Sequence, residues 1–114
     1  MGNLKEFVLL FRLPQDYQIE GEQSAMMAQQ WKKFIALIAS QVKLNSISQL
    51  NFDGVIIKND FSIEHKNFRE EGLFVNGTLT MKSETIEDVI LVAKKCPVLL
   101  AGGTVEIRQT ILIS

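Results

Sequence analysis

The chain has 114 residues and a mass of 12.9 kDa, the size of one ordinary domain. Hydrophobic residues make up 46% and charged residues 22%, proportions that are typical of globular proteins and exclude a disordered chain. The formal net charge of −1 and the pI of about 5.8 leave no basic excess to attract nucleic acid or an anionic membrane. We therefore expect a single domain over residues 1–114, with no nucleic-acid partner and no membrane partner.

The sequence lacks the features of an exported or membrane-bound protein. The N-terminal residues have neither the basic head nor the apolar core of a signal peptide, and the purely apolar runs are far shorter than the roughly 18 residues that cross a bilayer. Cys96 is the single cysteine, so no internal disulfide can form, as is usual in a reducing compartment. These features predict a cytoplasmic location.

The N-terminal third of the chain predicts a strand followed by a long helix. Residues 4–13 alternate so that Phe7, Leu9 and Phe11 share one face. Residues 22–42 show the spacing of three and four that is typical of an amphipathic helix. Its apolar stripe, which we interpret as core rather than as a cofactor site, contains Met27, Trp31, Phe34, Ile35, Ile38 and Val42.

The middle of the chain predicts two strand regions joined by a polar connection. Residues 46–58 form the first of them, and Asp53-Gly54 within it is a hairpin or bulge signal that divides it into two arms. Residues 59–72 are rich in charge and are interpreted as an exposed connection. Residues 73–82 alternate as the third strand.

The C-terminal third predicts a short helix and a last strand. Thr85 to Asp88 resembles a capping box, and Pro97 prevents the helix from continuing. Gly102-Gly103 then turns the chain into a strand over residues 104–112. The apolar side of this helix is expected to contain Ile86, Val89, Ile90 and Ala93.

This order of elements predicts an α+β fold of the ferredoxin-like, split βαβ type with an antiparallel sheet. The first and third strands would be central, and both helices would cover one face. The residues expected to meet the helices are Phe7, Leu9, Phe11, Val75, Leu79, Val105 and Ile107. The opposite face is expected to carry Val8, Leu10, Arg12, Phe74, Asn76, Thr78, Thr80, Thr104, Glu106 and Arg108. Because that face is half apolar, we expect a partner to cover it.

Several kinds of chemistry have no motif in the sequence. There is no phosphate-binding glycine loop, no CxxC and no HExxH, and one histidine with one cysteine cannot supply the ligands of a structural zinc site. We therefore expect no metal and no cofactor. A Ser-His-Asp triad stays open on spacing alone, although no nucleophile-elbow motif supports it.

Charged residues on the last strand are candidates for a ligand site. Glu106 and Arg108 are two positions apart and share one face, and the predicted topology brings Arg12 within their reach. An acid between two guanidinium groups could bind a small anion or position a proton donor. The alternative is a structural ion pair that closes a dimer or a sheet end. In both cases we expect Glu106 to bond Arg12, Arg108 or a group of the partner chain, because a covered charge is costly unless it is paired.

His65 and Cys96 are the other two candidates. His65 is the only histidine, and imidazole is the side chain best suited to proton transfer near neutral pH. It lies in the charged connection, where a solvated histidine is the alternative. Cys96 is interpreted as a small buried hydrophobe, with a reactive thiol as the alternative.

The chain resembles the YCII-related, or DGPF-domain, family over nearly its whole length. The best-matching stretch is Lys94-Lys95-Cys96-Pro97 followed by Gly102-Gly103-Thr104-Val105-Glu106-Ile107-Arg108. Supporting pieces are Phe7-Val8-Leu9-Leu10-Phe11, Trp31 and Thr85-Ile86-Glu87-Asp88. The Asp-Gly-Pro-Phe motif of the family falls on His65-Lys66-Asn67-Phe68, where only Phe68 keeps the residue of the family. Its Lys-Glu pair falls on Gly72-Leu73, and its usual proline on Gln109.

The resemblance implies a dimeric α/β barrel in which two ferredoxin-like sheets face each other and enclose one pocket per subunit. Some members of the family are proposed to be His/Asp-dependent lyases, and most have no established activity. We therefore predict a homodimer that binds a small molecule, such as an anion, in a pocket lined by Arg12, His65, Glu106 and Arg108. The alternative is a lyase or isomerase in which His65 transfers the proton.

Overall fold

The structure is a computed structural model that describes residues 4–17, 22–41, 43–70 and 72–111. Its strands are β1 (Lys5–Pro14), β2 (Lys43–Gln49), β3 (Asp53–Ile57), β4 (Ile63–Asn67), β5 (Leu73–Ser83) and β6 (Thr104–Gln109). Its helices are α1 (Glu22–Gln41) and α2 (Ile86–Ala93), together with the short 3₁₀ helices η1 (Phe68–Glu70) and η2 (Pro97–Ala101). Of the sequence predictions, Val42 in the helix stripe and Leu112 at the end of the last strand lie outside the described residues.

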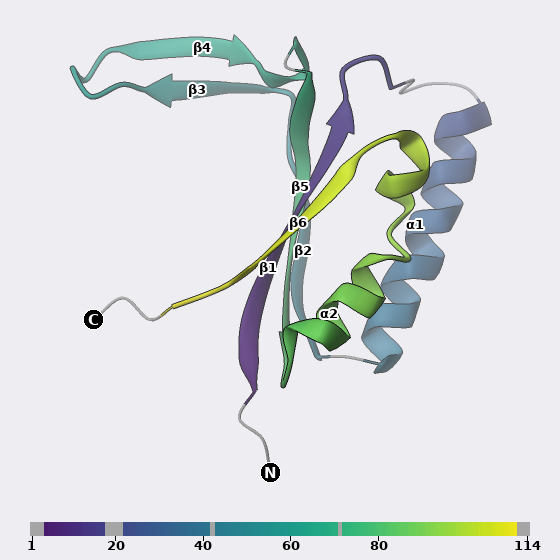
Figure 1. Cartoon of the computed structure of the whole chain (residues 1–114). Helices are drawn as coiled ribbons and strands as arrows, with labels where there is room; N and C mark the ends of the chain where they lie inside the picture. Colours follow the sequence, from purple (N-terminus) through teal and green to yellow (C-terminus); the bar gives the residue numbers. More distant parts are fainter. Residues whose placement is uncertain (1–3, 18–21, 42, 71, 112–114) are drawn as a thin grey trace.

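Four strands form an antiparallel sheet in the order β2-β5-β1-β6. β1 and β5 are central, as predicted, and α1 and α2 both lie against one face (Figure 1). This α+β arrangement is compatible with the ferredoxin-like fold expected from the sequence. It leaves the other face of the sheet without a helix.

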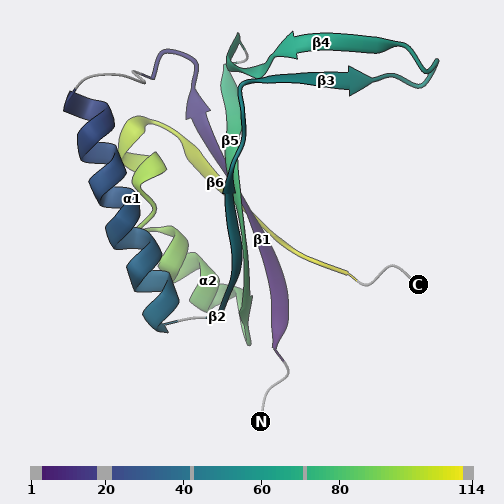
Figure 2. The same cartoon turned by 180° about the vertical axis from the view of Figure 1, so that it is seen from behind.

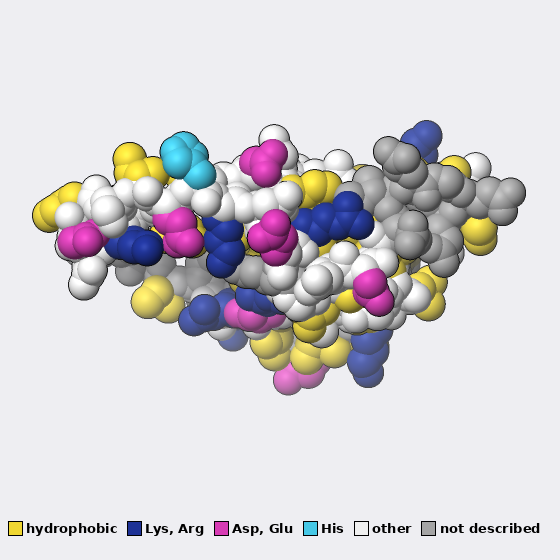
Figure 3. Space-filling view, turned by 90° about the horizontal axis from the view of Figure 1, so that it is seen from above, with side chains coloured by type: hydrophobic (Ala, Val, Ile, Leu, Met, Phe, Trp, Pro, Cys, Tyr) yellow, Lys and Arg dark blue, Asp and Glu magenta, His cyan; other side chains and the backbone are white. Residues whose placement is uncertain are grey.

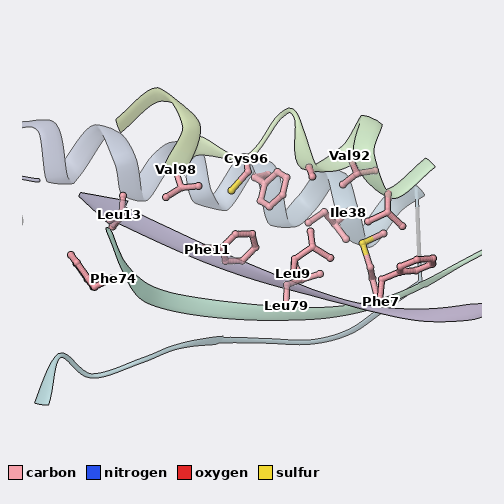
Figure 4. Close-up of a cluster of buried hydrophobic side chains, with 14 residues drawn as sticks. Phe7, Leu9, Phe11, Leu13, Ile38, Phe74, Leu79, Val92, Cys96 and Val98 are labelled. Carbon is pink, nitrogen blue, oxygen red and sulfur yellow. The ribbon is translucent and has the colours of Figure 1, made fainter. Parts of the chain in front are cut away.

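The core lies between the sheet and the two helices (Figure 4). The alternation predicted for β1 is confirmed, because Phe7, Leu9 and Phe11 are at most 1% exposed. α1 adds Phe34 and Ile38 to this layer. Burial of a large apolar side chain of this kind contributes about 1.5–3 kcal/mol to stability, so the layer holds both helices on the sheet.

The second helix begins after Thr85, as the sequence predicted, and ends at Ala93, before it reaches Pro97. The Thr85 hydroxyl oxygen accepts a hydrogen bond from the Asp88 N–H at 3.2 Å, which caps the first turn of α2. Val89 and Ala93 are buried as expected, whereas Ile86 and Ile90 are 40% and 37% exposed. The chain then turns at Gly102, whose φ of +85° is a conformation that favours glycine.

A β-bulge in β5 contradicts part of the predicted sheet pattern. Phe11 pairs with Gly77 but Arg12 pairs with Val75, so Asn76 is an extra residue. One extra residue reverses the alternation beyond it. Phe74 is therefore buried on the helix side at 1% exposure, and Val75 shares the face of Arg12. The predicted sides of Phe74 and Val75 were wrong, and Asn76 lines cavities on the helix side.

The middle of the chain also differs from its prediction. Residues 46–58 do not form one strand region divided by Asp53-Gly54, because β2 belongs to the main sheet and β3 pairs with β4 in a separate one. The charged connection over residues 59–72 therefore contains a strand. The hairpin turn lies after β3, where the Lys58 N–H donates to the Ser62 carbonyl oxygen at 2.9 Å. Phe61, with φ of +69°, occupies that turn.

The β3–β4 hairpin projects from the end of the main sheet on the side away from the helices (Figures 1 and 2). The chain measures 47 × 44 × 18 Å, with a radius of gyration of 15.8 Å. A compact chain of this length would have a radius of about 13 Å. The larger radius reflects this projection, since the hairpin and the main sheet together have the shape of an L (Figure 1).

Candidate functional site on the open face of the sheet

The helix-free side of the sheet, here called the open face, carries both apolar and charged side chains. Its members are Val8, Leu10, Arg12, Val75, Thr78, Thr80, Glu106 and Arg108. Val8 and Leu10 are only half-buried although they lie in the central strand β1. An apolar centre with a charged edge is a surface that another molecule could cover.

An ion-pair cluster lies on the β1–β6 side of the open face. The Arg12 guanidinium donates from Nη1 to Glu106 Oε1 at 2.7 Å, and Arg108 Nη1 lies 3.9 Å from Glu106 Oε2. Arg12 pairs with Thr104 and Leu10 with Glu106 in the strand register, which makes Arg12 and Glu106 diagonal neighbours. The predicted pairing of Glu106 is confirmed.

This cluster has the chemistry of an anion site. It contains two guanidinium groups and one carboxylate, and it therefore has a net charge of +1. The side chain of Arg108 is 75% exposed, so most of its donors are free to bind the oxygens of a carboxylate or phosphate. The side chains of Arg12 and Glu106 are 28% and 39% exposed, which places the pair at the boundary between buried and solvated.

His65 lies apart from this cluster in the single chain. It is on β4, where it pairs with Val55, and its side chain is exposed at the surface of the molecule (Figure 3). The imidazole makes no hydrogen bond or ion pair with the residues that the structure describes. The chain therefore brings Arg12, Glu106 and Arg108 together but not His65, and proton transfer by His65 stays a prediction.

Cys96 is a buried hydrophobe, as its sequence context indicated. It is 2% exposed in the core between α2 and η2. Burial raises the pKa of its thiol to about 11, because the charged thiolate is disfavoured away from water. The thiol is therefore protonated at neutral pH.

The hairpin carries a group of exposed apolar residues that the sequence interpretation missed. Val55, Ile57, Phe61 and Ile63 are 54%, 68%, 88% and 61% exposed. We call these four residues the hairpin patch. Val55 and Ile57 lie in the region that the sequence predicted as strand. Phe61 and Ile63 lie in the predicted polar connection, where the β-branched Ile63 is a strand signal among neighbouring charges.

Contacts at the base of the hairpin hold it to the rest of the chain. The Phe68 N–H donates to the Phe52 carbonyl oxygen at 2.8 Å. The Arg69 guanidinium donates to the Tyr17 carbonyl oxygen at 2.7 Å and lies 5.7 Å from the ring of Phe52. Because these contacts join η1 to the loops after β1 and β2, the projecting direction of the hairpin is supported by packing.

The described residues offer neither a metal cluster nor a membrane-spanning helix. In the ranges that it describes, no group of three or more His, Cys, Asp or Glu side chains could hold a metal ion. None of the helices described here combines the length and the hydrophobicity needed to cross a membrane.

Comparison with known proteins adds no family assignment. No protein-family model matches the chain, and no curated protein matches it significantly. The resemblance to YCII-related proteins thus rests on the sequence motifs described above. The features that indicate a function are therefore the Arg12–Glu106–Arg108 cluster and the helix-free face of the sheet.

Proposed function

We propose that this chain forms a homodimer in which two open faces meet and enclose a binding site for a small anionic molecule. The observation that carries the proposal is the Arg12–Glu106–Arg108 cluster at the edge of a half-apolar, helix-free sheet face. Such a dimer would be the barrel expected from the resemblance to YCII-related proteins.

The surface area of the chain supports the dimer. The accessible surface is 8075 Å², whereas a compact monomer of this mass exposes about 6,300 Å². The excess is about 1,800 Å² per chain, which is more than the roughly 800 Å² that each partner buries in a standard interface and matches the roughly 2,000–5,000 Å² that obligate homodimers bury over both chains. A second chain on the open face and the hairpin would remove this excess.

The position of the hairpin supports a two-fold arrangement. It projects on the same side as the open face (Figures 1 and 2), so a second chain could lie in the angle between the two. In a two-fold dimer each surface meets its complement on the partner. The hairpin patch of one chain would then contact the other chain, which would remove its apolar side chains from water.

The charge of the cluster supports an anionic ligand. A second chain on the open face would reduce the solvation of Arg12 and Arg108, while Glu106 neutralises only one of them. A buried charge without a partner is strongly unfavourable. A carboxylate or phosphate between the cluster and the partner chain would supply the missing charge and accept hydrogen bonds from Arg108.

Light scattering on a sizing column, at micromolar concentration, tests the dimer. We expect a mass of twice 12.9 kDa, and a stable monomer of 12.9 kDa would contradict the proposal.

Calorimetric titration with phosphate and with malonate tests the ligand class. We expect saturable binding of at least one of these anions to the dimer and its loss in Arg108→Gln. Lys95→Gln is a matched control, because it removes an exposed positive charge beside α1, on the helix side of the sheet and away from the cluster. Equal binding by Arg108→Gln and the unmodified protein would contradict the assignment of the cluster.

A further inference from the structure

A cleft lies on the opposite side of the sheet from the ion-pair cluster, between α1 and strands β2 and β5. Its volume is about 340 Å³, within the range of small-molecule sites. Phe11, Trp31, Ile35 and Ile47 form apolar walls, and Gln49 and Asn76 add amide groups to the lining. A second cavity of about 190 Å³ adjoins it and shares Trp31, Gln49 and Asn76 among its lining residues.

Small residues and the β-bulge account for the cleft. Ala28, on the exposed side of α1, lines both cavities with a single methyl group. Gly77 lies opposite Phe11 and lines the cleft with its backbone alone. The bulge places Asn76 on this side of the sheet, where simple alternation would have directed it to the open face.

The aromatic wall of the cleft is held in place by the core. The ring of Trp31 packs edge-to-face against Phe11, with centroids 5.2 Å apart, and against Phe34, with centroids 5.6 Å apart. Aromatic contacts of this geometry are favourable and directional. Trp31 therefore presents a fixed, partly exposed face to the cleft before any ligand arrives.

The lining determines the class of molecule that fits. None of the described residues around either cavity has a charged side chain, so an ionic ligand would lose its hydration without gaining a partner. The amides of Gln49 and Asn76 make no hydrogen bond with other described residues. Each amide can donate and accept, and together they can bind one polar edge of a ligand.

We infer that this cleft binds an uncharged, flat and mostly apolar molecule with a hydrogen-bonding group on one edge. The site is separate from the anion site proposed on the open face, and it needs no second chain, because α1, β1, β2 and β5 of one chain form it. Its chemistry is also opposite, since the open face offers guanidinium groups and the cleft offers aromatic rings and amides.

Two probes with the same ring skeleton test the inference. N-phenyl-1-naphthylamine is neutral and carries one N–H, and its 8-sulfonate is the corresponding anion. Trp31 is the only tryptophan, so bound naphthylamine should quench its emission by energy transfer. We expect saturable binding of the neutral probe with Trp31 quenching, and binding of the sulfonate that is weaker by about tenfold or more.

A pair of alanine variants locates the probe. Ala28→Leu fills the cleft from an exposed helix position, and Ala36→Leu makes the same change at another exposed position of α1 that lines neither cavity. Leucine is nearly as good a helix former as alanine, so both variants should fold, which circular dichroism would verify. We expect Ala28→Leu to weaken binding of the neutral probe by about tenfold and Ala36→Leu to change it less than about twofold.

Four results would overturn the inference. In two of them, the unmodified protein fails to bind the neutral probe, or binds it without quenching of Trp31. In the other two, the neutral probe and its sulfonate have equal affinities, or the Ala28→Leu and Ala36→Leu variants bind the neutral probe equally well. The oligomeric state does not enter these readouts, so the result is independent of the proposed dimer.

Discussion

Glu106 connects the stability of the chain to its proposed assembly. Its carboxylate accepts a hydrogen bond from Arg12 at 2.7 Å, with 39% of its side chain exposed in the single chain. A solvated ion pair contributes about 1 kcal/mol or less, whereas removing one partner of a buried pair costs about 3–5 kcal/mol. The cost of removing Glu106 therefore reports whether a second chain covers the cluster.

Glu106→Ala should lower the free energy of unfolding by about 2–4 kcal/mol in the dimer, because Arg12 would be covered without its partner. Glu106→Gln should cost less, since the amide keeps the shape and can still accept a hydrogen bond. Urea denaturation of the dimer measures both. If Glu106→Ala leaves stability and assembly unchanged, the pair is solvated and the cluster is not covered.

Cys96 predicts a pH dependence of stability. Its folded pKa is about 11, raised by burial from a usual value of 9.0, so the folded state holds the proton more tightly than the unfolded state. The corresponding stability is fully present below about pH 9 and is lost as the pH rises toward 11, a difference of about 2–3 kcal/mol. Cys96→Ala should reduce the fall of the free energy of unfolding over this pH range. Urea denaturation at a series of pH values between about 8 and 11 measures it. An unchanged slope would refute the assignment to Cys96.

At the scale of elements, the bulge in β5 decides which side chains face the helices and which face outward. Phe74 enters the core and Asn76 reaches the cleft because one residue of β5 has no partner in β1. Gly77, next to the bulge, also allows β2 to approach β5. A Cβ at this position would lie 2.8 Å from the Ser48 carbonyl oxygen, so strand pairing depends on the missing side chain.

Gly77→Ala should therefore destabilise the chain by about 1–3 kcal/mol, the usual cost of overpacking a close contact. Gly72→Ala is the matched control, because no atom lies within 4 Å of the Cβ that it would add. We expect the control to change stability by no more than about 0.5–1 kcal/mol. Thermal and urea unfolding of the two variants give the comparison, and equal stabilities would show that β2 can move without cost.

At the scale of the whole molecule, the hairpin is the feature that a single chain does not explain. Its apolar side chains are exposed while its base is anchored by Phe68 and Arg69. An exposed, apolar strand pair is a hazard for aggregation unless something covers it. Contact with a second chain would cover the hairpin and the open face together.

Ile57→Asp should shift the dimer toward the monomer, because it places a charge in the hairpin patch at a side chain that is 68% exposed in the single chain. Leu100→Asp is the control, since Leu100 is 77% exposed in η2, on the helix side of the sheet. Light scattering over a dilution series measures both variants. If Ile57→Asp dimerises as tightly as Leu100→Asp, the hairpin patch lies outside the interface.

The sequence alone determined the elements whose pattern is local and the sheet order that follows from them. Alternation placed Phe7, Leu9 and Phe11 in the core, a spacing of three and four identified α1, and Thr85 marked the start of α2. Because few topologies join such elements with right-handed crossovers, the sequence also placed β6 beside β1. Because β6 lies beside β1, the contact between Arg12 and Glu106 could be predicted from the sequence.

Only the tertiary structure decided the features that depend on register between distant segments. The bulge at Asn76 lies in the register between β5 and β1, and no pattern within residues 73–82 reveals it. The β3–β4 hairpin likewise depends on pairing between strands, in which Val55 lies opposite His65. This pairing places the only histidine in the hairpin and not beside Arg12 and Arg108. Trp31 fitted the apolar stripe of α1, but its partial exposure beside the cleft follows from Ala28, Gly77 and the bulge. Local periodicity specifies which residues avoid water, whereas the register of paired strands specifies what each residue meets.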